Sequence, residues 1–423
     1  MINKLFFIKI NRGMEETMAA NVRTKTISAL LAATASALVL SACGGDSDSG
    51  TAHAAPAPEL RVGPLGSAFW DVYRRPPADA KPGDVLYIQA RSDAPSGAKG
   101  WNVVYVSEIA PGKLAYVSGE IYAPAENASV PRDVVLWNHE TTGVADACAP
   151  SRRNTDEERI PALKALLEKG HIVVMSDYPG QGLPGPAYYM AGQPNARSSL
   201  DMLRVAQQMP DINASKRYVM YGWSQGGQTT MWAESIAPQY VPEFTGLGAA
   251  LIAPGVRIKD LTLRSMTSTS LAGYVISTLP GIKAYFPELR YGDFLTTEGL
   301  EQFPAMADGC FDVWNTAANV SEPYKPDALV EGSPWWQAMS KVDDFKPSGS
   351  MPFIIFQGDA DHDTPIELTL RERDAICEAG SSMEFRKYSG LDHSGVVPEA
   401  AKLFPDWADA RFKGQVAVNQ CDA

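Results

Sequence analysis

The chain has 423 residues, and its 49 acidic residues outnumber its 37 basic residues, which gives a net charge of −12. A protein that binds nucleic acid needs a basic face, so this balance argues against a nucleic-acid partner. We find no internal repeat. Once the N-terminal segments described next are set aside, about 365 residues remain, an ordinary length for an α/β enzyme that carries an insertion.

The first 42 residues predict a signal peptide. Arg23 and Lys25 precede an apolar run, residues 27–40, that is short for a membrane span and ends in small residues. The sequence LSACG at the end of this run resembles a bacterial lipobox, in which the cysteine, Cys43, is lipidated and becomes the new N-terminus. The alternative is an ordinary signal peptide with an incidental cysteine.

The N-terminal part therefore divides into a signal peptide and a tether. Residues 1–17 precede Met18, which suits the signal better as a start, so these residues are a candidate over-extended start. Residues 43–58 comprise the lipidated cysteine and a small, polar, Pro- and Ala-rich linker that cannot form a core. We predict an exported protein held on the cell envelope, most simply a bacterial outer membrane, through this anchor; the alternative is a periplasmic or secreted protein. The folded domain is expected to span residues 59–423.

Four cysteines remain after the anchor, and they are Cys148, Cys310, Cys377 and Cys421. An even number in an exported chain favours two disulfides, and three pairings are open. A zinc site would need close cysteine pairs, and none of the four is near another. We therefore expect no metal site and no cofactor.

Strand patterns come next in chain order. Residues 84–130 alternate apolar and polar side chains, which predicts antiparallel strands on one edge of a sheet. Beyond them, short apolar runs alternate with helix-like segments, and this predicts a mostly parallel sheet with helices on both faces. The runs assigned to this part of the sheet are residues 133–139, 171–180, 218–221, 247–254, 351–358 and 383–390.

The helix patterns complete this α/β order. A capping box, TDEE at residues 155–158, predicts the start of a helix that ends at Gly170. Further helices are expected at residues 198–209, from residue 224 to about 237, and at 371–380. The alternation is interrupted from about residue 255 to 350. An insertion of that length is usually functional, so we predict a mostly helical cap over the site.

The sequence GWSQG, residues 222–226, lies between a strand pattern and a helix pattern. In that context the turn lifts a serine above the carboxyl ends of a parallel sheet. A serine hydroxyl becomes a strong nucleophile when a neighbouring imidazole takes its proton and a carboxylate orients that imidazole. We therefore predict Ser224 as the nucleophile of an acyl-enzyme mechanism.

Two of the five histidines, His362 and His393, follow the serine. His362 lies inside the turn expected to carry the acid and leaves no room for a separate acid before it, so His393 is the candidate base. In the α/β-hydrolase pattern that the chain resembles, the acid lies a few residues past a glycine and ahead of a proline. In the turn GDADHDTP this position is Asp361, with Asp363 as its rival; Asp359 is then a turn residue. The DxDxD run also resembles a calcium loop, but it lacks that loop's glycine and glutamate.

A tetrahedral intermediate needs two backbone N–H groups aimed at its oxyanion. One is expected from Gln225, at the N-terminus of the helix after the nucleophile. The other is expected from the loop HETTG, residues 139–143, which follows the strand ending in WNH.

Taken together, these motifs resemble the secretory lipase family, whose best-known member is a yeast lipase of the A type with an α/β-hydrolase fold and a large cap. The resemblance runs from Phe69 to the C-terminus and is carried, in order, by FWDVYRRPP, PGDVLYIQA, DACAPS, SDYPGQG, YGWSQGG, GDADHDTP and GLDHSG. It implies a triad of Ser224, Asp361 and His393, with Thr141 as the second oxyanion donor. It also implies the disulfides Cys148–Cys310 and Cys377–Cys421. This sequence departs from many bacterial relatives in having Glu140 where they have glycine.

The leading functional prediction is an exported carboxylic ester hydrolase, a lipase or esterase that acts on small-molecule or lipid esters. Five cap aromatics suggest an apolar acyl or aromatic group, unless they form the cap core; these are Tyr274, Tyr285, Phe286, Trp335 and Trp336. A serine aminopeptidase or prolyl-type peptidase is the alternative, and it would need a cap carboxylate such as Glu298 or Glu301. A third possibility is an inactive, anchored binding protein.

Overall fold

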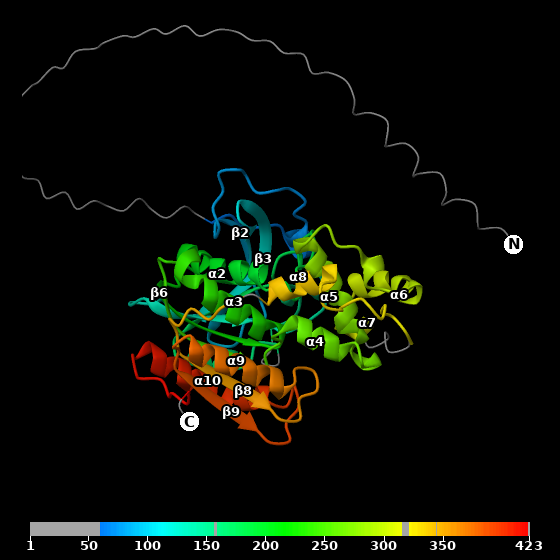
Figure 1. The fold of residues 1–423 in the computed structure, drawn as a ribbon. Coiled ribbons are helices and arrows are strands. Elements are labelled where there is room, and N and C mark those ends of the chain that lie inside the picture. The colour runs from blue at the N-terminus through cyan, green and yellow to red at the C-terminus, as the bar shows by residue number, and fades with distance from the viewer. Residues whose placement is uncertain (1–59, 156–158, 315–320, 344, 422–423) are drawn as a thin grey trace, which may run out of the picture. The chain divides into compact units, whose positions relative to one another are not determined.

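The fold is built on a nine-stranded sheet in the order β1-β2-β3-β5-β4-β6-β7-β8-β9 (Figure 1). The computed structural model describes residues 60–155, 159–314, 321–343 and 345–421. The predicted signal peptide, Cys43 and the tether lie outside these residues. The strands are β1 Val85–Ala90, β2 Ala98–Ala110, β3 Lys113–Pro124, β4 Arg132–Asn138, β5 Ile172–Ser176, β6 Ala214–Trp223, β7 Thr245–Ile252, β8 Phe353–Gly358 and β9 Met383–Tyr388.

The direction of the strands confirms the predicted mixture. Strands β1 to β3 pair antiparallel, as do β3 and β5, whereas β5, β4, β6, β7, β8 and β9 are parallel to one another. Side chains alternate between the two faces of the sheet. On β4, Val134 and Leu136 join one buried apolar cluster while Val135 and Trp137 join the other.

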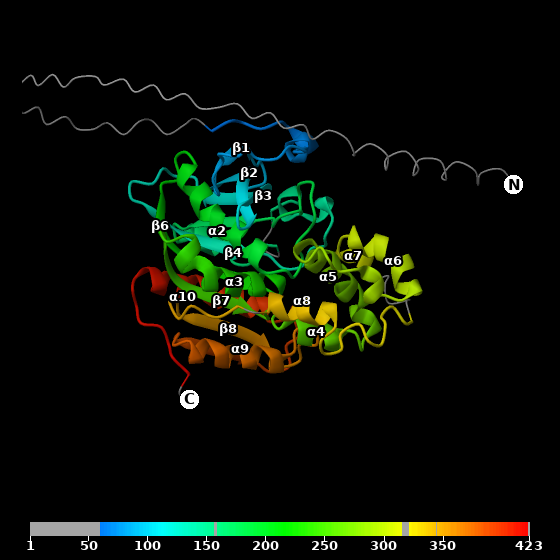
Figure 2. The same ribbon diagram turned by 45° about the horizontal axis from the view of Figure 1, so that its top comes forward.

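Helices cover both faces of the sheet (Figure 2). Side chains of α2 (Gln193–Gln208), α3 (Gln225–Tyr240) and α9 (Ile366–Glu378) lie in the first cluster. Those of α1 (Leu163–Glu168) and α10 (Val397–Phe412) lie in the second. A parallel sheet buried on both sides explains why its strands read as nearly continuous apolar runs.

Three helix predictions were wrong in detail, and one of them is the helix expected at 371–380, since α9 begins at Ile366. Helix α1 begins at Leu163 rather than at the TDEE sequence; the Thr155 hydroxyl is hydrogen-bonded to the Tyr122 hydroxyl at 2.5 Å, and residues 156–158 lie outside the described part. Helix α2 begins at Gln193, five residues before the predicted start. Pro194 occupies its first turn, where a missing N–H costs nothing.

Helix α10 was not predicted. Pro398 stands in its first turn and Pro405 in its interior, and an internal proline is a strong signal against a helix. Burial of Phe404 and Ala408 against the sheet compensates for this poor local propensity.

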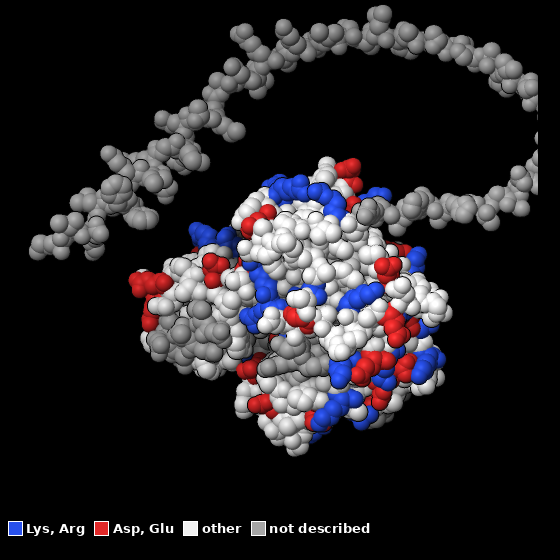
Figure 3. Space-filling model, turned by 180° about the vertical axis from the view of Figure 1, so that it is seen from behind, with Lys and Arg blue, Asp and Glu red and all other residues white. Residues whose placement is uncertain are grey.

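The segment between β7 and β8 is mostly helical, and we call residues 255–350 the cap. It forms a lobe at the left of Figure 3, with charged side chains of both signs on its surface. The cap has its own apolar cluster, which includes the fully buried Trp335 and Phe294. Its α-helices are α4 Ile258–Ser265, α5 Ala272–Tyr285, α6 Thr297–Ala307, α7 Phe311–Trp314 and α8 Pro334–Val342.

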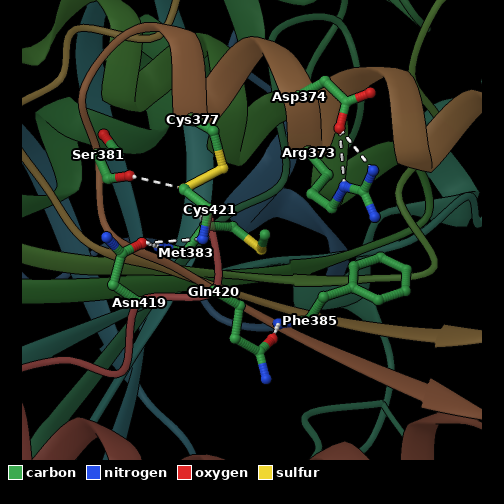
Figure 4. The surroundings of a disulfide bond; sticks show 9 residues. All are labelled: Arg373, Asp374, Cys377, Ser381, Met383, Phe385, Asn419, Gln420 and Cys421. Carbon is green, nitrogen blue, oxygen red and sulfur yellow. Dashed lines mark hydrogen bonds and ion pairs between the residues drawn. A yellow bond between two sulfur atoms is a disulfide. The ribbon is translucent and has the colours of Figure 1, made fainter. Parts of the chain in front are cut away.

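Both disulfides implied by the family resemblance are present. Cys148–Cys310 joins the loop after β4 to the cap, across 162 residues of sequence. Cys377–Cys421 joins α9 to the C-terminal tail, across 44 residues. Figure 4 shows that tail beside β9, where the Phe385 N–H donates to the Gln420 side chain at 2.6 Å.

Candidate active site

Ser224 lies at the turn between β6 and α3, in a backbone conformation that side chains rarely adopt. Its φ is 55° and its ψ is −116°, and its N–H donates to the Ile252 carbonyl at 3.0 Å. Its own carbonyl accepts hydrogen bonds from Gly227 and Gly255 at 2.9 and 2.8 Å. These bonds fix a strained turn that exposes the serine hydroxyl above the sheet.

Gly222 and Gly226 permit this turn because the backbone comes too close for a side chain. A Cβ on Gly226 would lie 1.9 Å from the Asn138 carbonyl oxygen, and one on Gly222 would lie 2.1 Å from the Gly226 carbonyl oxygen. The first contact places the end of β4 directly against the start of α3. Both glycines of the motif are therefore required by packing.

Asp361 and His393 follow the carboxyl ends of the neighbouring strands β8 and β9. His393 Nδ1 lies 2.9 Å from Asp361 Oδ2, and the Asp361 side chain is fully buried. Gly358 allows the two loops to approach, since a Cβ there would lie 2.1 Å from the Leu391 carbonyl oxygen. The ring of His393 is also near that of Trp223, the residue before the serine, at 5.6 Å between centroids.

Two residues that the sequence reasoning did not identify hold the Asp361 carboxylate. Thr364 donates to Oδ1 through its N–H at 2.8 Å and to Oδ2 through its hydroxyl at 2.8 Å. The buried Gln357 amide donates to Oδ2 at 3.1 Å. Burial would raise the pKa of Asp361, but the hydrogen bonds from His393 and Thr364 prevail, so its pKa is lowered. The carboxyl is therefore an anion at neutral pH.

The predicted oxyanion donors lie close to the serine. Gln225 is the first residue of α3, and Thr141 lines the same cavities as Ser224. Within the described residues, no acceptor is hydrogen-bonded to either backbone N–H. The Thr141 hydroxyl is 3.0 Å from the Tyr189 hydroxyl, which fixes the loop on one side. The two N–H groups are thus available to an oxyanion.

The cap fixes the same loop on its other side. The Phe311 N–H donates to the Thr142 carbonyl at 3.2 Å, and the Val144 N–H donates to the Gly309 carbonyl at 3.0 Å. The disulfide between Cys148 and Cys310 lies beside these bonds. The loop from 139 to 143 therefore depends on a cap segment far away in sequence.

His139, which opens this loop, is a structural residue. It is fully buried, its ring stacks on Tyr178 at 4.2 Å, and its Nδ1 lies 2.6 Å from the Glu140 carbonyl oxygen. Burial lowers its pKa to about 4. The imidazole is neutral in the folded protein down to that pH.

This buried imidazole should make the fold sensitive to acid. In the unfolded chain the His139 imidazole takes up a proton near pH 6.5, whereas in the folded chain it does so near pH 4. Protonation therefore favours the unfolded chain, and the free energy of unfolding falls as the pH is lowered from 6.5 towards 4. Between pH 7 and 5 the loss should be about 2 kcal/mol. Urea unfolding at both pH values would measure it.

A His139→Gln variant isolates this contribution from the carboxyls, several of which act in the opposite direction. Burial raises the pKa of Asp201 to about 7 and that of Asp343 to about 6, so they favour the folded state on acidification. Between pH 7 and 5, the free energy of unfolding of the variant should fall by about 2 kcal/mol less than that of the parent. An equal loss in both proteins would contradict the assignment.

Two cavities of unequal size meet at the serine. An inner cavity of about 50 Å³ lies under α4 and α5, and an outer cavity of about 900 Å³ lies between the oxyanion loop and the start of α10. Both are lined by Thr141, Ser224, Tyr274, Asp363 and His393. Within the described residues, Ser224 and His393 are not hydrogen-bonded to each other; such bonds often tighten only when substrate is bound.

The other two aspartates of the Asp361 turn do not bind the His393 imidazole. Asp359 is a turn residue, as expected, because its side chain accepts from the Gly390 N–H at 2.7 Å. Asp363 lines both cavities, and burial raises its pKa.

Among the cap aromatics, Tyr274 lines the cavities while Trp335 is cap core. Neither cavity is lined by Glu298 or Glu301, the two cap carboxylates suggested for a peptidase.

The chain is similar to known lipases in sequence and in fold. The model of the family described as "Secretory lipase" matches residues 154–324. Lipase 10 of Candida albicans is 23% identical, over 83% of this chain and 82% of its own, and a secreted triacylglycerol lipase of Malassezia furfur is 23% identical, over 81% and 78%. The closed state of Candida antarctica lipase A superposes with a TM-score of 0.65 at 18% identity, over 80% of this chain and 84% of that one.

These matches support the secretory lipase family and the α/β-hydrolase fold predicted from the motifs. They also support a hydrolase of the carboxylesterase or triacylglycerol lipase type.

Proposed function

We propose that this chain, a relative of the secretory lipases, is an exported serine ester hydrolase that forms an acyl-enzyme on Ser224. The observation that carries the proposal is one cavity edge at which a strained serine turn lies beside a histidine bound to a buried carboxylate. No step of this reaction requires a cofactor.

In this mechanism the carboxylate of Asp361 accepts the N–H of His393 Nδ1, which leaves the lone pair on Nε2. Nε2 takes the proton of the Ser224 hydroxyl as the oxygen attacks the ester carbonyl, and then gives it to the leaving alcohol as the ester C–O bond breaks. Water attacks the acyl-enzyme by the same route and releases the carboxylic acid. The Thr141 and Gln225 N–H groups stabilise the oxyanion in both halves.

The mechanism is tested by trapping the covalent intermediate. A fluorophosphonate, which phosphonylates an activated serine, should label the full-length protein once, on the peptide that contains Ser224. Mass spectrometry would locate the label, and hydrolysis of p-nitrophenyl esters would be lost in proportion to it. Labelling at another serine, with loss of activity, would refute the assignment.

The two disulfides should differ in their effect on catalysis. The chain-entropy model gives about 5 kcal/mol for the Cys148–Cys310 loop and about 4 kcal/mol for the Cys377–Cys421 loop, so removing either destabilises the fold. Only Cys148–Cys310 lies beside the oxyanion loop. We expect the double alanine variant of this pair to lose about 10-fold or more in kcat.

The double alanine variant of Cys377 and Cys421 is the matched control, and its kcat should stay near that of the parent below its unfolding temperature. Kinetics and thermal unfolding of both variants at one temperature separate the two effects. Equal losses of kcat in the folded variants would show that the first disulfide has no special role at the site.

We also propose that the protein is exported by its N-terminal signal and held on the cell envelope through Cys43. The support is the lipobox-like sequence and, more broadly, the secreted relative. Within the described residues, no helix is long and apolar enough to span a membrane. Radiolabelled palmitate should be incorporated in a bacterial host and should be absent from a Cys43→Ala variant; equal labelling of both would refute the anchor.

A further inference from the structure

We propose that the inner cavity holds the acyl group of the substrate and restricts it to a short chain, while the outer cavity takes a larger alcohol group. The substrate class is then a short-chain ester, from acetyl to butyryl, of a bulky alcohol. This inference rests on the proposed serine ester hydrolase and adds to it which part of the ester lies on each side of Ser224.

The size of the inner cavity sets the limit on the acyl chain. At about 50 Å³ the inner cavity is far smaller than the outer one, at about 900 Å³, so its size favours a short acyl chain. A butyryl chain has three carbons beyond its carbonyl, whereas an octanoyl chain has seven. The outer cavity, at about 900 Å³, is large enough for a whole drug-sized group.

The position of His393 assigns the two ends of the ester. Its imidazole must deliver a proton to the leaving alcohol, so the alcohol lies on the side towards which the histidine loop continues. Ser394 and Val397, which follow the histidine, line the outer cavity alone. The inner cavity extends the other way, under α4 and α5, and there the acyl group must point.

Part of the wall of the inner cavity is apolar and buried, and Thr262, Ser265 and Thr278 add hydroxyl groups to it. Ile258 and Val275 are 1% and 2% exposed, and both belong to the apolar cluster of the cap. Met190, Leu261 and Leu271 also belong to the apolar part of the lining. Because the atoms behind this wall are already packed, a longer chain cannot enter simply by displacing solvent.

Close contacts also hold the wall in place. A Cβ on Gly281 of α5 would lie 2.2 Å from the Tyr189 carbonyl oxygen, so this helix is in direct contact with the core. At the start of α4, the N–H groups of Ile258 and Lys259 donate to the Asp343 carboxylate at 2.7 and 3.0 Å. Enlarging the cavity would require breaking these contacts.

The test is the acyl-length profile of the full-length protein on p-nitrophenyl esters from acetate to palmitate, which share one alcohol. We expect kcat/KM to fall by at least about 100-fold between butyrate and octanoate, because even one misfitting methylene can cost about 10-fold or more. Acetates of progressively larger alcohols should stay within about 10-fold of one another.

Variants of the wall make the test specific. Leu261→Ala and Val275→Ala enlarge the inner cavity and should raise the octanoate-to-butyrate ratio by about 10-fold. Ile276→Ala is the matched control, since Ile276 is a fully buried residue of the same helix that does not line the cavity. Its profile should match that of the parent, and thermal unfolding would verify that each variant is folded.

The outcomes separate this inference from the proposed function. A parent enzyme that hydrolyses octanoate or palmitate as well as butyrate would overturn the short-acyl limit and leave the ester hydrolase intact. Rates that fall with the size of the alcohol rather than of the acyl chain would overturn the orientation. Failure to hydrolyse any ester, together with no fluorophosphonate label on Ser224, would overturn the proposed function itself.

Discussion

Replacing Ser224 with alanine should lower kcat on p-nitrophenyl butyrate by about 10⁴-fold or more, while KM stays within a few-fold of the parent value. The reason is that the substitution removes the oxygen that forms the acyl-enzyme and leaves the cavities and the oxyanion loop unchanged. Fluorophosphonate labelling should disappear together with the activity. Retention of full activity would mean that the nucleophile lies elsewhere.

A second substitution at the same position tests the strained backbone separately from catalysis. Since φ at Ser224 is 55°, a glycine there would relieve strain that alanine retains. Ser224→Gly should be as inactive as Ser224→Ala but more stable than it by about 1 kcal/mol in urea unfolding. If the glycine variant were the less stable of the two, the strained turn would not describe the protein in solution.

Replacing Asp361 with asparagine should lower kcat by about 10⁴-fold at neutral pH. Asparagine can still accept the N–H groups of Asp363 and Thr364 on one side. On the other side its NH₂ group would donate to His393 Nδ1 and place the ring proton on Nε2. The histidine would then be in the wrong tautomer to accept the proton of the serine. Steady-state kinetics with thermal unfolding would measure both the loss and the integrity of the fold.

Asp363→Asn is the matched control, since both aspartates lie in one turn and both are near His393. Asp363 lines the cavities but does not hydrogen-bond the imidazole. Its asparagine variant should keep kcat within about 10-fold of the parent. If Asp363→Asn lost more activity than Asp361→Asn, Asp363 and not Asp361 would be the carboxylate that orients His393.

The sequence allowed good prediction where a motif is local. The strand, turn and helix around GWSQG were predictable because glycine spacing and apolar runs report directly on a sharp turn after a buried strand. The order of the parallel strands then placed the turns of Asp361 and His393 at the same edge of the sheet. The start of α1 and the existence of α10 were not predictable in this way. The Thr155 hydroxyl is hydrogen-bonded to Tyr122, and α1 begins only at Leu163. In α10, burial overrides the prolines.

The residues that hydrogen-bond the Asp361 carboxylate could not be predicted from the sequence either. Thr364 and Gln357 hold the Asp361 carboxylate, yet a threonine or a glutamine beside a turn has no pattern that distinguishes it from a surface residue. The volume of the inner cavity depends on how α5 packs against Tyr189, a contact between segments about ninety residues apart. Such distances are set by the assembled fold and not by any one stretch of the chain.

The bridge between Cys148 and Cys310 makes assembly of the site depend on where the chain is oxidised. In a reducing compartment the thiols stay apart, and the oxyanion loop is then joined to the cap by the backbone hydrogen bonds at Thr142 and Val144 without a covalent link. Oxidation after export supplies that link. Under the proposed function and export, we therefore expect full ester hydrolysis only after the chain has reached an oxidising compartment.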